Sequence, residues 1–189
     1  MRKFTIITLL AAAAMCLLPA CNEEDSTAKL NNAYEEWYKK NKAWLDEEVK
    51  RTNEDGSPYY QTVIPDWDPN AYVLIHYFND RAETEGNLSP MYTSTIDTRY
   101  WCGYYDGTPL DSSTLVTDPA PGIFRCQLSG VISGWAIAME QMRVGDTAEV
   151  VIPYQQAYGT SLTAGVPPYS NLRYNIRLVD IVDYEKNPK

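Results

Sequence analysis

The sequence predicts an α+β fold, in which an antiparallel sheet of five or six strands wraps around one short helix and follows an N-terminal amphipathic helix. The first observation is a series of strand-like runs between residues 59 and 184, with clear apolar–polar alternation in the last of them. The second is that a single helical run lies among these strands, so strands and helices do not alternate as in a doubly wound fold. The third is a helical pattern ahead of the first strand, at residues 26–50.

Residues 1–20 have the pattern of a secretory signal peptide. Arg2 and Lys3 form a short basic head, an apolar run follows, and the small residue Ala20 ends it. Cys21 comes directly after Leu-Pro-Ala, and this arrangement resembles a bacterial lipoprotein signal. The resemblance implies cleavage before Cys21 and lipid on that residue, which anchors the chain to the cell envelope, at the outer membrane. An ordinary signal peptide with a chance cysteine is the alternative.

The mature chain is strongly acidic. The 189-residue sequence has 16 Lys and Arg against 25 Asp and Glu. Residues 1–20 hold two of the basic residues and none of the acidic ones, so their removal leaves 14 against 25, a net charge of −11. That charge argues against nucleic acids and anionic lipid surfaces as partners. The acidic stretch 22–26 is either a solvated linker or a surface-export signal of the kind found in some Gram-negative lineages, and both interpretations stay open.

Residues 21–58 are predicted to form a tether and an amphipathic helix. Ser26 or Thr27 can cap the helix over 26–50, and TNEDGSP at 52–58 ends it. We expect its aromatic stripe to pack on the main domain, and a homodimer or another partner bound through residues 26–50 is the alternative. The stripe consists of Leu30, Tyr34, Trp37, Trp44 or Leu45, and Val49.

Residues 59–189 are predicted to be one domain. Its helical run is 133–143, and the residues on the apolar face of that run are Trp135, Ala138, Met139 and Met142. Gly145-Asp146 then turns the chain into the next strand. The strand-like runs are 59–64, 71–79, 93–105, 122–128, 146–152 and 172–184.

The sequence lacks the residue patterns of most catalytic centres. His76 is the single histidine, and no group of Cys and His has the spacing of metal ligands, so we expect no metal and no cofactor. The serine nucleophile elbow and the glycine-rich phosphate loops are also missing. Cys102 and Cys126 lie on strands expected to be neighbours, and whether they form a disulfide stays open, because a bridge needs Cα atoms within about 7 Å.

One loop is unusual for a soluble protein. Residues 152–172 contain three tyrosines, two glycines and three prolines without a charged residue. With three other segments it resembles the FKBP-type peptidyl-prolyl cis-trans isomerase family. The segments are DGTPLDSS (106–113), GVISGWAIAMEQMRVGD (130–146), IPYQQAYG (152–159) and VPPYSNLRYNIRL (166–178). The resemblance covers about residues 93–182, and the four motifs occur in the family's order.

The resemblance implies a rotamase that helps proteins fold by isomerising X–Pro bonds in a dry aromatic pocket, with proline-containing segments as substrates. Tyr158 would donate its hydroxyl to one substrate carbonyl, the Ile132 backbone N–H would donate to another, and Asp111 would lie beside the twisting amide. Trp135 would be the pocket floor. The other substrate-binding residues implied are Tyr100, Leu110, Phe124, Val131, Val166 and Tyr174.

Three departures from the family pattern bear on the activity. Leu110 stands where the family has phenylalanine, Tyr174 stands where it has phenylalanine on the last strand, and Cys102 takes the place of a glycine. A catalytically weak binding module or chaperone on the same fold is therefore the alternative function. A structural surface lipoprotein that assembles through its N-terminal helix is a third class.

Overall fold

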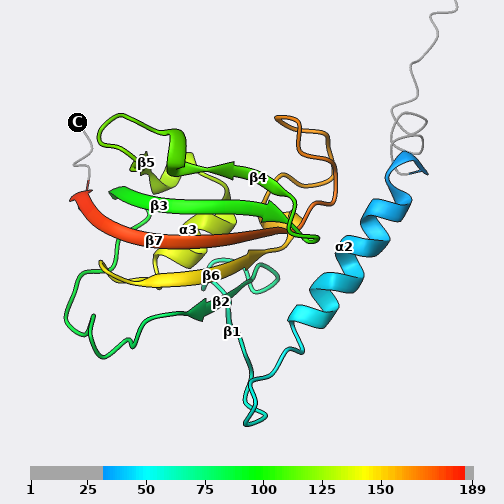
Figure 1. Cartoon of the computed structure of the whole chain (residues 1–189), viewed down its shortest axis with the longest axis horizontal. Coiled ribbons are helices and arrows are strands. Elements are labelled where there is room, and N and C mark those ends of the chain that lie inside the picture. The colour runs from blue at the N-terminus through cyan, green and yellow to red at the C-terminus, as the bar shows by residue number, and fades with distance from the viewer. Residues whose placement is uncertain (1–31, 186–189) are drawn as a thin grey trace, which may run out of the picture. The chain divides into compact units, whose positions relative to one another are not determined.

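A computed structural model describes residues 32–185 (Figure 1). Within this range a seven-stranded sheet has the order β1-β2-β6-β7-β3-β4, with β5 paired to β3, and every pairing is antiparallel. The predicted α+β class is confirmed. The strands are β1 (Gln61–Val63), β2 (Val73–Tyr77), β3 (Thr95–Tyr104), β4 (Pro109–Ser112), β5 (Phe124–Gln127), β6 (Thr147–Ile152) and β7 (Leu172–Asp183).

The sheet has one strand more than the five or six predicted. The additional strand is β4, which is four residues long and begins with Pro109. The sequence does not predict this strand, because proline lacks the N–H that a strand ladder needs and four residues show almost no apolar–polar alternation. It pairs with β3 only, across a bulge between Cys102 and Gly103. The bulge lies in β3 opposite Pro109 and Asp111, where the DSS motif begins in β4.

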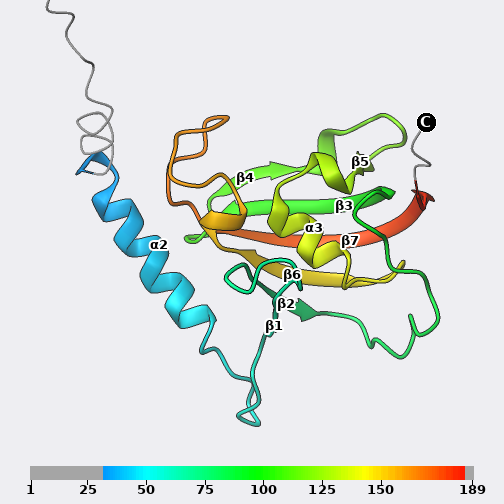
Figure 2. The same ribbon diagram turned by 180° about the vertical axis from the view of Figure 1, so that it is seen from behind.

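A single short helix, α3 (Ser133–Met139), lies against one face of the sheet (Figure 2). It is four residues shorter than the predicted run 133–143, because the backbone N–H of Arg143 bonds the Asp146 carboxylate and the chain already turns there. Met142 nevertheless stays buried. Three 3₁₀ turns complete the domain, at η1 (Ser113–Leu115), η2 (Leu128–Gly130) and η3 (Tyr154–Gln156).

The N-terminal helix α2 (Glu35–Glu48) packs on the domain that follows it. Asn41 is fully buried, its side-chain oxygen accepts from the Asn171 N–H at 2.8 Å, and its carbonyl accepts from the Asn171 side chain at 2.7 Å. The Trp37 indole N–H donates to Ser170 at 3.0 Å. At the other end of the helix, Arg173 donates to the Glu48 carboxylate at 2.9 Å. The helix is therefore attached by polar bonds as much as by its aromatic rings.

The predicted stripe of α2 is correct in part. Trp37, Trp44 and Leu45 are half-buried, but Val49 is 49% exposed, because buried polar residues form part of the contact face. Tyr34 precedes the helix as its N-cap. The predicted caps Ser26 and Thr27, and Leu30 of the stripe, lie outside the described residues. Among residues 32–185, no helix has the length and apolarity that a membrane span requires.

Cys102 and Cys126 are both free. The two strands are neighbours as expected, but Cys126 of β5 lies opposite Ile96 of β3, six residues before Cys102. At about 3.3 Å per residue this separation is roughly 20 Å, which is far beyond the reach of a disulfide. Burial raises the pKa of each thiol to about 12, so both stay protonated at neutral pH.

We expect both thiols to titrate in protein that was denatured without reductant. In the native protein, a thiol reagent at pH 8 should react with both slowly, because the protonated thiol is a poor nucleophile. The measurement is a thiol count on the chain beginning at Asn22, which contains these two cysteines alone. A count of zero in denaturant would show that a disulfide forms and that the strand register is wrong.

Candidate active site

The residues predicted from the family resemblance gather around one hollow of about 340 Å³ on the face of the sheet that α3 covers. Eight of the ten predicted catalytic and substrate-binding residues line it, together with Gly130. They come from β3, β4, β5, β7, the start of α3 and the loop after β6. The eight are Tyr100, Asp111, Phe124, Val131, Ile132, Trp135, Tyr158 and Tyr174.

Trp135 forms the buried end of this hollow. It is 3% exposed, and three aromatic rings meet it edge to face, at centroid distances of 5.3 Å for Tyr100, 5.6 Å for Tyr174 and 6.0 Å for Phe124. Such edge-to-face contacts add to the burial energy of the rings. The glycine before it sets how closely α3 approaches β6, because a Cβ on Gly134 would lie 2.3 Å from the Ile152 side chain. The Gly-Trp pair thus seats the ring under the sheet.

Tyr100 and Asp111 form the polar side of the hollow. The Tyr100 hydroxyl donates to one Asp111 oxygen at 2.6 Å, and the backbone N–H of Ser112 donates to the other at 2.7 Å. Burial and this hydrogen bond raise the pKa of Tyr100, so its hydroxyl stays protonated at neutral pH. The carboxylate is therefore held at a fixed place on the rim of the hollow.

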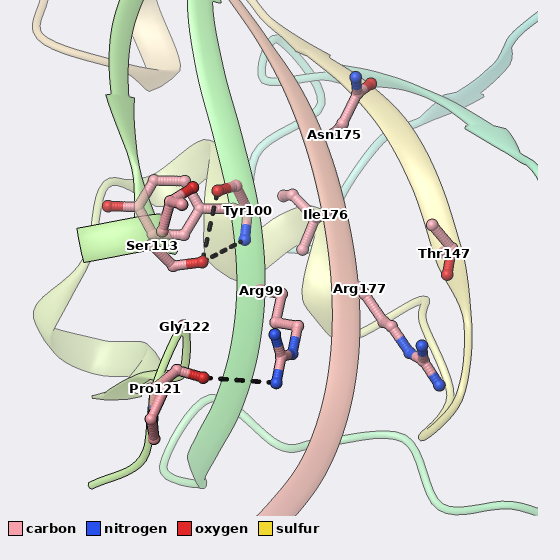
Figure 3. A pocket seen from close by; sticks show the side chains of 10 residues that line it. Arg99, Tyr100, Ser113, Pro121, Gly122, Thr147, Asn175, Ile176 and Arg177 are labelled. Atoms are coloured by element: carbon pink, nitrogen blue, oxygen red, sulfur yellow. Dashed lines mark hydrogen bonds between the residues drawn. The ribbon is translucent and has the colours of Figure 1, made fainter. Parts of the chain in front are cut away.

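Ser113 holds the backbone of Tyr100 and was not predicted as a site residue. Its hydroxyl accepts from the Tyr100 N–H at 3.0 Å and donates to the Tyr100 carbonyl at 3.4 Å (Figure 3). The second serine of the DSS motif thus fixes the strand that carries the ring. The DSS motif is the one sequence feature that points to this serine. Its residue type and spacing do not distinguish a serine that binds a neighbouring strand's backbone from an ordinary turn serine.

Two hydrogen-bond donors of the hollow have no partner within residues 32–185. The Tyr158 hydroxyl makes no hydrogen bond there, and burial raises the pKa of this tyrosine, which keeps it a donor. The Ile132 N–H is likewise unpaired, because Ile132 is the N-cap of α3 and precedes the first helical bonds. The chain reverses directly after Tyr158, where Gly159 has φ +73° and its N–H bonds the Tyr154 carbonyl.

Two departures from the family pattern lie on neighbouring strands. Tyr174 lies opposite Cys102 across β7 and β3. Tyr174 is 6% exposed and Cys102 is fully buried, and both side chains belong to the hydrophobic core beside the hollow. Burial raises the pKa of Tyr174, so its hydroxyl stays protonated at neutral pH. The hollow therefore has a neutral hydroxyl in the wall where the family has a phenylalanine.

Leu110 and Val166 do not line the hollow. Leu110 precedes Asp111 in β4 and packs half-buried against the core cluster, because successive strand residues point in different directions. Val166 is buried at the tip of the loop after β6, where it pairs with Thr163 through two backbone hydrogen bonds. The uncharged loop thus contributes Tyr158 to the hollow, and none of the VPP residues lines it.

A second hollow of about 520 Å³ lies on the outward face of the sheet, away from α3 (Figure 3). Arg99, Asn175 and Arg177 are exposed there, as are Thr114 and Pro121, and Arg99 donates to the Pro121 carbonyl at 3.4 Å. Tyr100 takes part through its backbone, and its ring lies in the first hollow. This surface contains no other residue that the motifs predict.

Known proteins similar to this chain carry the same domain. Residues 86–179 match the family described as FKBP-type peptidyl-prolyl cis-trans isomerase. The macrophage infectivity potentiator of Trypanosoma cruzi is 36% identical over 107 residues, 56% of this chain and 53% of that protein. The FKBP-type 22 kDa peptidyl-prolyl cis-trans isomerase of Escherichia coli is 35% identical over 94 residues, 49% of this chain and 44% of that protein. The chain spans about half the length of these relatives.

Two solved structures share the fold. FkpA from Escherichia coli superposes with a TM-score of 0.65 at 21% identity, covering 86% of this chain and 67% of that one. A peptidyl-prolyl cis-trans isomerase from Pseudomonas syringae superposes with a TM-score of 0.59 at 23% identity, covering 78% of this chain and 95% of that one. Together, the ordered motifs, the fold and the match over residues 86–179 show that the chain belongs to the FKBP-type peptidyl-prolyl cis-trans isomerase family.

Proposed function

We propose that the chain is a peptidyl-prolyl cis-trans isomerase that acts on proline-containing segments of proteins folding outside the cytoplasm. The observation that carries the proposal is the convergence of eight residues, all implied by the family resemblance, on one hollow with aromatic walls, two unpaired donors and one carboxylate. No nucleophile and no proton transfer to a side chain is required for this reaction, which suits a site of this composition.

The proposed mechanism is selective binding of the twisted amide. Rotation about an X–Pro bond has a barrier of about 18–20 kcal/mol, because the planar amide is stabilised by resonance. The twisted transition state has lost that resonance and its carbonyl is less polar, so an apolar pocket favours it over the planar ground state. Trp135 receives the proline ring, while the Tyr158 hydroxyl and the Ile132 N–H hold substrate carbonyls. Asp111 lies beside the rotating bond.

Tyr158→Phe is expected to lower kcat/KM by about three- to tenfold, the loss that follows from removing one hydrogen bond of about 0.5–1.5 kcal/mol. The ring remains, so the melting temperature should not change. Leu110→Phe restores the aromatic residue of the family next to the hollow and is expected to raise kcat/KM. A protease-coupled assay with a proline peptide measures both. If the parent is active and neither substitution changes its rate, the pocket assignment is wrong.

A catalytically weak binding module or chaperone on the same fold is the second candidate function. Leu110 favours it, because it packs beside the hollow in place of the family's phenylalanine and a smaller side chain there supports the aromatic wall less. The hydroxyl of Tyr174 also favours it, because it adds a polar group to the wall of the hollow. A protein of this second class would bind a proline peptide in a titration without accelerating its isomerisation.

A lipid on Cys21 is proposed as the anchor to the cell envelope. The support is the lipoprotein-like signal and the similarity to an outer membrane protein MIP of Legionella longbeachae, 33% identical over 93 residues. We expect Cys21→Ser to abolish both fatty-acid labelling and sedimentation with membranes, because no acyl chain remains to be buried. A variant that still labels and sediments would show that Cys21 is not the lipidation site.

A homodimer through residues 26–50 is disfavoured by the contacts of α2. Trp37, Asn41 and Glu48 already bind the chain's own domain. A dimer would therefore have to use the exposed, charged side of the helix, where Lys39 and Lys42 form ion pairs with neighbouring acids of the same helix. Such exposed pairs contribute little to association.

A further inference from the structure

A third hollow lies along another side of α3 and shares one wall with the candidate active site. It has a volume of about 470 Å³, and Val131 lines both hollows. Because α3 separates them, a peptide that crosses Val131 passes from one hollow to the other. We call it the α3 side pocket. It is lined by Trp67, Tyr92, Val131, Ser133, Ala136, Ile137 and Glu140.

Large aromatic side chains stand exposed at this pocket. Trp67 is 65% exposed and Tyr92 is 54% exposed. Trp67 belongs to the connection between β1 and β2, and Tyr92 precedes β3, so two separate loops bring these rings to the same side of α3. Exposed aromatic rings beside a hollow of this size are typical of ligand and peptide sites, since a ligand that covers them removes apolar surface from water.

The pocket also contains a carboxylate without a cationic partner. Glu140 is half-buried at the C-terminal end of α3, and it forms no ion pair with any Lys or Arg of residues 32–185. Burial raises its pKa, an effect that a hydrogen bond from the Tyr92 backbone offsets in part. A desolvated carboxylate of this kind gains more from a cation than a fully solvated one does.

Aromatic rings and a carboxylate together suit one class of side chain. Lysine and arginine have an aliphatic stem that packs on rings, a cationic head that is attracted to ring faces, and a charge that pairs with a carboxylate. The alternative occupants fit less well, because an acidic side chain would meet Glu140 and a purely apolar one would leave its carboxylate buried without a cation. The net negative charge of the chain also favours cationic segments.

We propose that the α3 side pocket binds a Lys or Arg side chain of the client polypeptide, located a few residues from the isomerised proline. The inference rests on the proposed isomerase function and adds the substrate class. It assigns Trp67 and Glu140 a part in substrate selection, whereas the candidate active site performs the isomerisation without them. Their effect should therefore appear only with substrates long enough to reach across Val131.

The test compares matched peptides. One series carries Lys, Leu or Glu at the second, third and fourth positions on either side of a central Ala-Pro, and a short Ala-Pro tetrapeptide is the reference. For the mature chain carrying Cys21→Ser, at low ionic strength, we expect kcat/KM to be about fivefold higher for Lys than for Leu in at least one position, and lowest for Glu. Glu140→Gln and Trp67→Ala should each reduce this preference to less than twofold without changing the rate on the tetrapeptide.

Glu54→Gln is the matched control, because it removes the same charge from an exposed site in the loop at 52–58. It should retain the preference for Lys. Equal rates for the Lys, Leu and Glu peptides in the parent would overturn the inference, and so would an unchanged preference in Glu140→Gln. In either case, catalysis of the tetrapeptide would still support the proposed function. A preference for Leu would also overturn it, because the pocket would then be an apolar subsite. No catalysis of any peptide would instead contradict the isomerase function itself.

Discussion

Trp135→Ala is expected to lower the free energy of unfolding by about 3–5 kcal/mol, the usual cost of removing a buried tryptophan side chain. The ring is almost fully buried, and Tyr100, Phe124 and Tyr174 would lose their common contact. Trp135 lies on α3 beneath β3 and β7, so the neighbouring backbone has little freedom to move into the cavity that the substitution leaves. Urea unfolding monitored by circular dichroism measures the change.

Leu115→Ala is the control for this experiment. Leu115 is 91% exposed, so its removal should change the free energy of unfolding by no more than about 0.5 kcal/mol. Trp135→Ala should also lose isomerase activity, but either the lost pocket or the lost stability would cause this. The activity of this variant therefore does not test the mechanism. A loss of stability below 1 kcal/mol would show that the ring is not the packed floor described above.

Asp146→Ala should be similarly destabilising, by about 3–5 kcal/mol, because it leaves several buried polar groups without their partner. The Asp146 carboxylate is fully buried and accepts from Thr84 at 2.6 Å, from Asn79 at 3.1 Å and from the Arg143 N–H at 2.8 Å. Arg81 lies 3.4 Å away as its ion-pair partner. This single side chain joins the loop after β2 to the turn that ends α3.

Glu85→Ala removes an exposed acid from the same loop and should leave stability nearly unchanged. Chemical denaturation of the two variants side by side separates loss of the buried network from a general effect of charge. If both variants unfold at the parent's urea concentration, Asp146 is hydrated in solution and the loop is not held by it.

The main features of the fold and hollow could be predicted because local patterns specify them. Alternation over residues 172–184 marked β7, and the apolar face with Trp135 marked α3. The aromatic and polar residues of the hollow follow from the family resemblance, since no single spacing or composition brings Tyr100 and Tyr158 together. Leu110 and Val166 are predicted on its walls, but neither lines the hollow.

Other features depend on contacts between distant segments, which local patterns do not contain. Tyr174 and Cys102 are separate departures in the sequence, and their position opposite each other follows from the register of β7 on β3. The hydrogen bonds between Asn41 and Asn171 join residues 130 positions apart. Nothing in the sequence distinguishes a buried asparagine on a helix from a solvent-exposed one. The short strand β4 needed its partner β3 to become recognisable. Tertiary context decided each of these cases.

The rate of X–Pro isomerisation in the presence of the protein tests the central claim most directly. The uncatalysed reaction takes tens to hundreds of seconds at 25 °C, so a protease-coupled assay can resolve catalysis above it. For the soluble chain beginning at Asn22, we predict a rate constant that rises in proportion to protein concentration. A folded protein that leaves the uncatalysed rate unchanged at every concentration would contradict the isomerase function.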